Sequence, residues 1–132
     1  MPAEPTWLDR AILEALHADQ ILEHGGGAGL RDEGLLESAL ARPRQKWHYD
    51  PGTDLATLAA AYAFGVAKNH PFIDGNKRVT LVAAYTFLAV NGLELEAPEP
   101  EAVSVIMGTA DGSLTEDDLA PWIRAHLIPW AD

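Results

Sequence analysis

The chain has 132 residues, of which 48% are hydrophobic, so it is long and apolar enough for one domain with a single core and is not expected to be disordered. It contains no cysteine, which excludes disulfide frameworks and thiolate metal sites. The formal net charge of −11 disfavours direct binding to nucleic acid or to anionic membranes, because both need clustered Lys and Arg. We therefore expect a single domain over residues 1–132, with neither a nucleic acid nor a membrane among its partners.

The sequence contains no stretch typical of a membrane span or a targeting signal. The longest apolar stretch, residues 55–67, is shorter than the ~20 residues that cross a bilayer. The first six residues lack the basic and apolar regions of a signal peptide. These features predict a soluble, cytoplasmic protein.

Residues 7–23 predict the first helix. The stretch Thr6–Asp9 forms a variant of the capping box, and apolar side chains follow at helical spacing. His17 and His24 have no partner at metal-ligand spacing, so we predict structural or solvated roles for both. The run Gly25–Gly29 ends the helix as a loop. Because no strand precedes this loop and neither lysine nor threonine follows it, we do not assign phosphate binding to it.

Two more helices are predicted before residue 70. Asp32 can cap the second helix, which Pro43 is expected to stop. Residues 44–54 are polar and contain a Pro-Gly pair, so they predict a connector. Asp54 can cap the third helix, Leu55 to about Asn69, whose apolar positions run almost all round and predict burial.

The second half predicts three further helices. Residues 79–90 form a second buried helix, which Asn91 and Gly92 end. A very short strand is possible at residues 93–95, and a fifth helix follows at Glu101–Ala110. A final helix begins after a capping threonine and turns these side chains inward: Leu119, Trp122, Ile123 and Leu127.

The predicted fold class is therefore all-α, a compact helical bundle in which two buried central helices are joined by the densest polar stretch of the chain. That stretch, residues 70–78, reads His-Pro-Phe-Ile-Asp-Gly-Asn-Lys-Arg. A helix that begins near Gly75 or Asn76 points its free N–H groups and the positive end of its dipole into the turn, which favours an anion. Lys77 and Arg78 stand where the dipole disfavours cations, so their presence indicates a negatively charged ligand.

Other residues of this turn indicate a reaction. Gly75 permits a tight turn and the close approach of a phosphate. Asp74 can hold Mg²⁺ through one oxygen, and the His70 imidazole can accept a hydroxyl proton near neutral pH. Together these groups suit phosphoryl or nucleotidyl transfer. Two alternatives stay open: a solvated turn in which Asp74 is only a cap, and a zinc pair of His70 and Asp74 without an evident third ligand.

The few cations gather in two places. One cluster surrounds the polar turn and indicates a local site for an anionic ligand rather than a nucleic-acid footprint: Lys68, Lys77 and Arg78. The other lies in the predicted connector or just before it: Arg42, Arg44 and Lys46.

Residues 70–78 resemble the signature of the Fic/Doc superfamily, His-x-Phe-x-Asp/Asn/Glu-Gly/Ala-Asn, which Gly-Arg follows in Fic adenylyltransferases and Lys-Arg follows in Doc (death-on-curing) toxins. Lys77 stands on the Doc side of this difference. The stretches 25–43 and 108–127 also look like Doc-type segments, so the resemblance covers roughly residues 7–127.

The resemblance implies a compact helical fold and an ATP-dependent kinase that phosphorylates a Ser or Thr of a translation elongation factor and halts translation. In that scheme His70 takes the hydroxyl proton and Asp74 holds Mg²⁺. The ATP phosphates bind at Gly75, Asn76, Lys77 and Arg78. The loop of residues 25–30 is implied to be a flap that aligns the target segment.

The resemblance also implies a partner. Doc proteins form type II toxin–antitoxin pairs with a Phd-type antitoxin, whose flexible C-terminal segment folds onto the toxin. The sequence has no convincing internal Ser/Thr-x-x-x-Glu inhibitory motif, which is consistent with inhibition by a separate protein. Two other functions stay open: a Fic-type protein adenylyltransferase, since only Lys77 separates the branches, and a catalytically silent binding module with the same fold.

Overall fold

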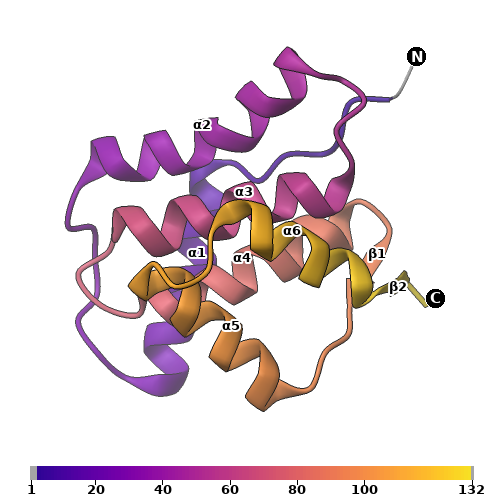
Figure 1. Cartoon of the computed structure of the whole chain (residues 1–132). Helices are drawn as coiled ribbons and strands as arrows, with labels where there is room; N and C mark the ends of the chain where they lie inside the picture. The colour runs from indigo at the N-terminus through magenta and orange to yellow at the C-terminus, as the bar shows by residue number, and fades with distance from the viewer. Residues whose placement is uncertain (1–2, 132) are drawn as a thin grey trace.

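The computed structural model describes residues 3–131; residues 1, 2 and 132, at the ends of the predicted domain, lie outside the described part. Within residues 3–131 the elements follow in this order: α1 (Arg10–His24), α2 (Glu33–Tyr49), α3 (Leu55–Asn69), α4 (Asn76–Val90), β1 (Leu93–Leu95), α5 (Glu99–Asp111), α6 (Glu116–Ala125) and β2 (Leu127–Pro129) (Figure 1). The predicted all-α fold is confirmed, and the short strand at residues 93–95 is present. None of these helices has the length and apolarity that a membrane crossing requires.

Helix α3 is the centre of the fold. It packs against α2, α4 and α6, and nearly all of its side chains from Ala56 to Ala67 are buried (Figure 1). Helix α2 approaches closely at Gly65, where an added Cβ would lie 3.1 Å from the Cα atom of Ala39. The prediction of two buried central helices joined through residues 70–78 is confirmed by α3 and α4.

The first helix begins later than the sequence indicates. Asp9 is its N-cap, and the Asp9 carboxylate accepts a hydrogen bond from the N–H of Ile12 at 2.9 Å. Thr6 is outside the helix: its N–H and C=O pair with the side-chain amide of Asn91 at 2.8 and 2.9 Å. The predicted cap at Thr6 is wrong, because this contact with the end of α4 holds the backbone of Thr6 away from helical pairing.

The second helix is not stopped by Pro43. Helix α2 continues to Tyr49, so most of the predicted connector at residues 44–54 is helical. A proline inside a helix removes one N–H donor and costs about 3 kcal/mol, and tertiary contacts must offset that cost. Pro43 itself is buried, together with Leu36, Ala39 and Leu40 on the same helix.

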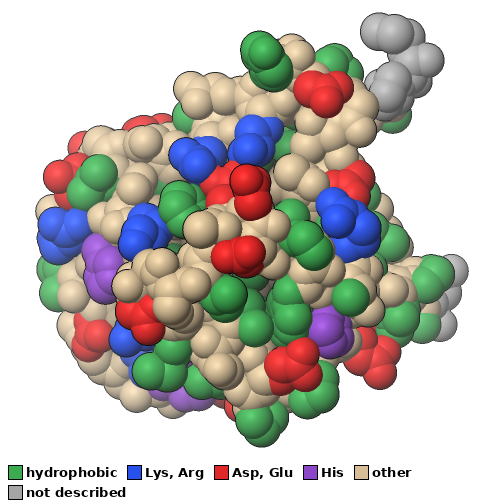
Figure 2. Space-filling view, viewed as in Figure 1, with side chains coloured by type: hydrophobic (Ala, Val, Ile, Leu, Met, Phe, Trp, Pro, Cys, Tyr) green, Lys and Arg blue, Asp and Glu red, His purple; other side chains and the backbone are tan. Residues whose placement is uncertain are grey.

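Contacts with α6 and the N-terminal segment hold the second half of α2 in place. Arg42 and Lys46 both pair with the buried carboxylate of Glu116, Lys46 at 2.9 Å. The guanidinium of Arg44 lies 5.7 Å from the ring centroid of Trp7. This basic cluster is therefore part of the packing, and Figure 2 shows Lys and Arg side chains interspersed with Asp and Glu on the visible face.

The last helix begins as predicted and ends earlier. Thr115 and Asp118 form a complete capping box at the start of α6. Leu127, predicted to lie on the inward face of this helix, is in strand β2, where it pairs with Leu95 of β1 in an antiparallel register. That part of the prediction is wrong, because backbone pairing with a strand distant in the sequence replaces the next helical turn.

Candidate active site

The turn between α3 and α4 is bounded by two residues in the left-handed conformation. His70 caps the end of α3 with a φ of 48°, and Gly75 caps the start of α4 with a φ of 75°. Within residues 3–131, His70 is the only residue other than glycine with a positive φ. Such a conformation costs about 1–3 kcal/mol and persists only where surrounding contacts impose it, often at functional sites.

Arg31 supplies part of that constraint. Its Nε and Nη2 atoms lie 2.7 Å from the carbonyl oxygens of His70 and Asn69, respectively. Its backbone N–H donates to the carbonyl of Pro71 at 2.7 Å. A cation at the carbonyl end of a helix is also favoured by the helix dipole. Sequence reasoning missed this role, because a lone arginine carries no signal for a contact 39 positions away.

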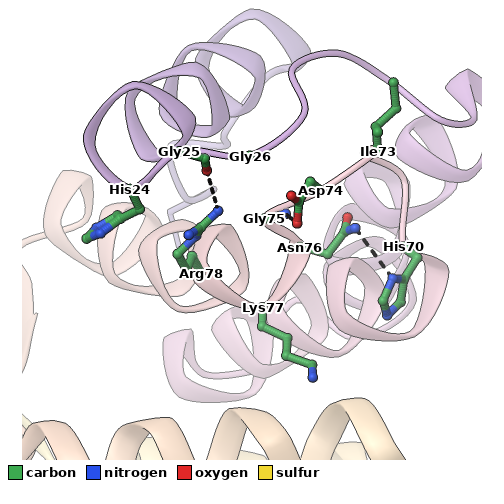
Figure 3. A pocket seen from close by; sticks show the side chains of 10 residues that line it. All are labelled: His24, Gly25, Gly26, His70, Ile73, Asp74, Gly75, Asn76, Lys77 and Arg78. Carbon is green, nitrogen blue, oxygen red and sulfur yellow. Dashed lines mark hydrogen bonds between the residues drawn. The ribbon is translucent and has the colours of Figure 1, made fainter.

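The Asn76 side chain ties the turn together. Its Oδ1 accepts a hydrogen bond from the N–H of Phe72 at 3.0 Å, and its Nδ2 donates to the carbonyl of Phe72 at 2.9 Å. Nδ2 also lies 3.4 Å from Nδ1 of His70, a long contact that orients the imidazole (Figure 3). The buried side-chain amide of Asn76 is therefore occupied by hydrogen bonds within the turn. In the described part of the chain, only its backbone N–H is free to donate to a ligand.

Asp74 is the carboxylate of the turn. Its Oδ1 accepts a hydrogen bond from the N–H of Gly75 at 2.8 Å, and its Oδ2 accepts one from the N–H of Gly27 at 3.3 Å. These two bonds, first that of Gly75, hold the pKa of the carboxyl below its usual value, so the group is charged at neutral pH. Residues 3–131 contain no group of three His, Asp or Glu side chains placed to hold a metal, so the zinc pair with His70 gains no third ligand.

A pocket of about 610 Å³ opens over this turn. The structure brings all the predicted site residues to its wall: His70, Asp74, Gly75, Asn76, Lys77 and Arg78 (Figure 3). Ile73 and the end of α1 complete the lining with His24, Gly25 and Gly26. His24, for which we predicted a structural or solvated role, therefore lies at the edge of the pocket.

The start of α4 offers donors to an anion. The N–H groups of Asn76, Lys77 and Arg78 occupy the first helical positions, where no intrahelical acceptor exists. Arg78 donates from Nη2 to the carbonyl of Gly25 at 3.0 Å, whereas its buried Nε has no partner within residues 3–131. An unpaired buried donor beside free helix N–H groups fits a phosphate chain, and a single ionised carboxylate fits the Mg²⁺ that accompanies phosphates.

The predicted cationic cluster is divided. Lys77 and Arg78 line the pocket, and Lys68 does not. The pKa of the Asp111 carboxyl is lowered mainly by hydrogen bonds from Ser113 and in addition by the positive charges of Lys68 and Lys77. A Cβ added at Gly112, which caps the end of α5, would lie 3.5 Å from Nζ of Lys68, so this end of α5 lies next to that lysine.

The glycine run lies against the Asp74 turn. The carbonyl of Gly29 accepts from the N–H of Ile73 at 3.1 Å, and Leu30 pairs with Phe72 in an isolated antiparallel bridge. Gly26 has a φ of 115°, and a Cβ added there would lie 2.5 Å from Oδ2 of Asp74. The predicted loop is confirmed, and glycine is required where it passes the carboxylate.

Gly26→Ala is expected to displace the Asp74 carboxylate from the N–H of Gly27 and to raise the pKa of that carboxyl toward its usual value. As the pH falls, the carboxylate would then become protonated at a higher pH than in the parent, because a hydrogen bond to its charged form is lost. NMR titration of the Asp74 carboxyl carbon measures this shift. Gly25→Ala is the matched control, since it imposes a similar positive φ with nothing within 4 Å of the added Cβ. The same titration curve in all three proteins would contradict the expectation.

In the structure, an asparagine side chain bonds across a turn between two buried helices. A histidine lies at one end of this turn and a helix N-terminus at the other. This is the arrangement expected from the resemblance of residues 70–78 to the Fic/Doc signature. Residues 7–88 match the Fic/DOC family, and since this is more than half of the chain, the protein belongs to that family.

Two relatives confirm the predicted Doc branch. The chain is 34% identical over 112 residues to the "Protein kinase doc" of Escherichia phage P1. The matched residues make up 85% of this chain and 88% of the relative. It is 45% identical over 74 residues to the "Toxin Doc" of Mycolicibacterium smegmatis. Here the matched residues make up 55% of this chain and 57% of the relative.

Proposed function

We propose that this protein is the toxin of a type II toxin–antitoxin pair and that it transfers the γ-phosphate of ATP to a Ser or Thr hydroxyl of a translation elongation factor. The observation that carries the proposal is that His70 and the start of α4, with its unpaired donors, line the same pocket (Figure 3). The names of the two relatives, one a kinase and one a toxin, support the same class of activity.

The phosphates of ATP are proposed to bind at the N-terminus of α4. The backbone N–H groups of Asn76 and Lys77 and the guanidinium of Arg78 are donors at the positive end of a helix dipole. Gly75 permits close approach, although its own N–H is already bonded to Asp74. When bound at Asp74, Mg²⁺ would neutralise part of the phosphate charge.

His70 is proposed to be the general base. The hydroxyl oxygen of the target bonds to the γ-phosphorus while the bond from phosphorus to the β–γ bridging oxygen breaks, and ADP leaves with that electron pair. His70 takes the hydroxyl proton and later returns it to water. Because this reaction depends mainly on positioning and charge stabilisation, the constraint on His70 by Arg31 and Asn76 supports the role.

The remaining parts of the proposal concern partners. Gly25 and Gly26 line the pocket, and Gly29 accepts a hydrogen bond from the N–H of Ile73; the loop of residues 25–30 is proposed to align the target segment next to His70. A Phd-type antitoxin is proposed to block the site through its C-terminal segment. Both interactions would take place in the cytoplasm, where translation factors act.

Two labelled forms of ATP test the proposal. Purified elongation factors are incubated with the protein and Mg²⁺, with the label on the γ-phosphate in one sample and on the α-phosphate in the other. We expect the elongation factor to carry the γ-label alone. Incorporation of the α-label would identify an adenylyltransferase. No incorporation of either label, with ATP binding retained, would identify a catalytically silent binding module.

A further inference from the structure

A buried histidine lies directly behind the candidate active site and has no part in the proposed chemistry. His17, on α1, is 3% exposed. Its ring stacks on that of Phe72, with the centroids 3.8 Å apart and the planes 6° from parallel. Its Nε2 lies 2.7 Å from the carbonyl oxygen of Asp74. Because a carbonyl oxygen can only accept, Nε2 carries the hydrogen of this bond.

The bond acts on the peptide unit between Asp74 and Gly75. In a trans peptide the C=O and the N–H point in opposite directions, so a group that holds the oxygen also sets the direction of the N–H. The N–H of Gly75 donates to Oδ1 of Asp74 at 2.8 Å. His17 thus holds one end of a peptide unit whose other end holds the carboxylate of the site.

The same imidazole lies close to the start of α4. A Cβ added at Gly75 would lie 3.6 Å from Nε2 of His17 and 3.3 Å from Nη2 of Arg78, so the three groups are near neighbours. If stacking on Phe72 were the only role of residue 17, an apolar aromatic ring would serve equally well, because it loses no hydrogen bonds to water when it is buried. The hydrogen bond to Asp74 is what distinguishes histidine from phenylalanine at this position.

We propose that His17 is a positioning residue: it orients the Asp74–Gly75 peptide so that the Asp74 carboxylate and the first N–H groups of α4 face the phosphates and Mg²⁺. The effect on activity rests on the proposed function. The effect on the peptide unit does not, and it is measured separately.

Two variants separate the hydrogen bond from the ring. His17→Gln keeps a donor nitrogen the same number of bonds from Cα and loses the stacked ring, whereas His17→Phe keeps the ring and loses the donor. His126→Phe is the matched control: His126 lies against Trp122 with centroids 4.6 Å apart, and its Nδ1 lies 2.7 Å from a carbonyl oxygen, that of Trp122. His126 does not line the site pocket.

Three measurements are made on each variant: the ¹H–¹⁵N resonance of Gly75, the KM and kcat for ATP in γ-phosphate transfer, and the melting temperature. For His17→Phe we expect a shifted Gly75 resonance and a KM raised about tenfold, the effect of one hydrogen bond, with a smaller change in kcat. His17→Gln should keep the Gly75 resonance and the KM near those of the parent. Its melting temperature should be equal to or below that of His17→Phe, because stability follows the ring.

Equal effects of the Gln and Phe substitutions, whether both small or both large, would overturn the proposal, because the donor would then not matter. An unchanged Gly75 resonance in His17→Phe would also overturn it. If the parent itself transfers no phosphate, the proposed kinase function fails, and the Gly75 resonance in the two variants still decides whether His17 orients the peptide.

Discussion

His70→Asn is expected to lower the rate of phosphate transfer by about 10²–10⁴-fold while leaving the fold unchanged, because removal of a general base has an effect of this size. Asparagine is chosen since it tolerates the left-handed conformation in which residue 70 is held, with its φ of 48°. The side chain is exposed, so little packing is lost. The initial rate of γ-label incorporation into the elongation factor measures the effect, and the melting temperature tests the fold.

His70→Ala is the companion variant. Alanine lacks the local hydrogen bonds that help asparagine adopt this conformation, so we expect the same loss of transfer with an additional loss of stability of about 1 kcal/mol. A parental rate in His70→Asn would exclude His70 as the base. Unchanged growth inhibition in cells that express either variant would favour the silent binding module over any enzyme.

Arg78→Ala is expected to raise the KM for ATP by about 10–100-fold. Hydrogen bonds from a charged donor are worth about 1.5–3 kcal/mol, and each 1.4 kcal/mol is tenfold in affinity. The structure adds a second effect, because the same guanidinium donates to the carbonyl of Gly25 and so connects α4 to the glycine loop. We therefore expect kcat to fall as well. Steady-state kinetics with varied ATP separate the two parameters.

Two matched variants separate charge from geometry at this position. Arg78→Lys keeps the charge and loses the planar fork, so it should restore only part of the affinity. Lys77→Ala removes an exposed cation that has no hydrogen bond within residues 3–131, and its effect on KM should be smaller than that of Arg78→Ala. A large loss of melting temperature in Arg78→Ala would assign this residue a structural role instead of phosphate binding.

The candidate site was predictable because its residues are contiguous. A helix end and a helix start within residues 70–78 place these side chains around one turn whatever the rest of the fold does. The helices on either side were predictable for a similar local reason. Asp54 caps α3 through the N–H of Thr57, only three residues away, and Thr115 caps α6 in the same way.

The errors all arise where long-range contacts outweigh local signals. Thr6 pairs with Asn91 instead of capping a helix, and Leu127 pairs with Leu95 in a strand. At Pro43 the cost of one missing donor is offset by the packing of α2 against α3 and by the ion pairs of Arg42 and Lys46 with Glu116 of α6. Local periodicity contains no information about partners so far away in the chain.

The sequence by itself determined that a helix N-terminus with free N–H groups follows a histidine, and that both stand where two buried helices are joined. Only the tertiary structure decided which contacts fix their positions. Arg31 donates to a carbonyl at the end of α3, Gly26 lies against the Asp74 side chain, and His17 bonds to the carbonyl of the Asp74–Gly75 peptide. The physical reason is that a turn specifies which groups are adjacent, whereas the direction of each peptide plane and carboxylate depends on partners that reach it from another helix or loop.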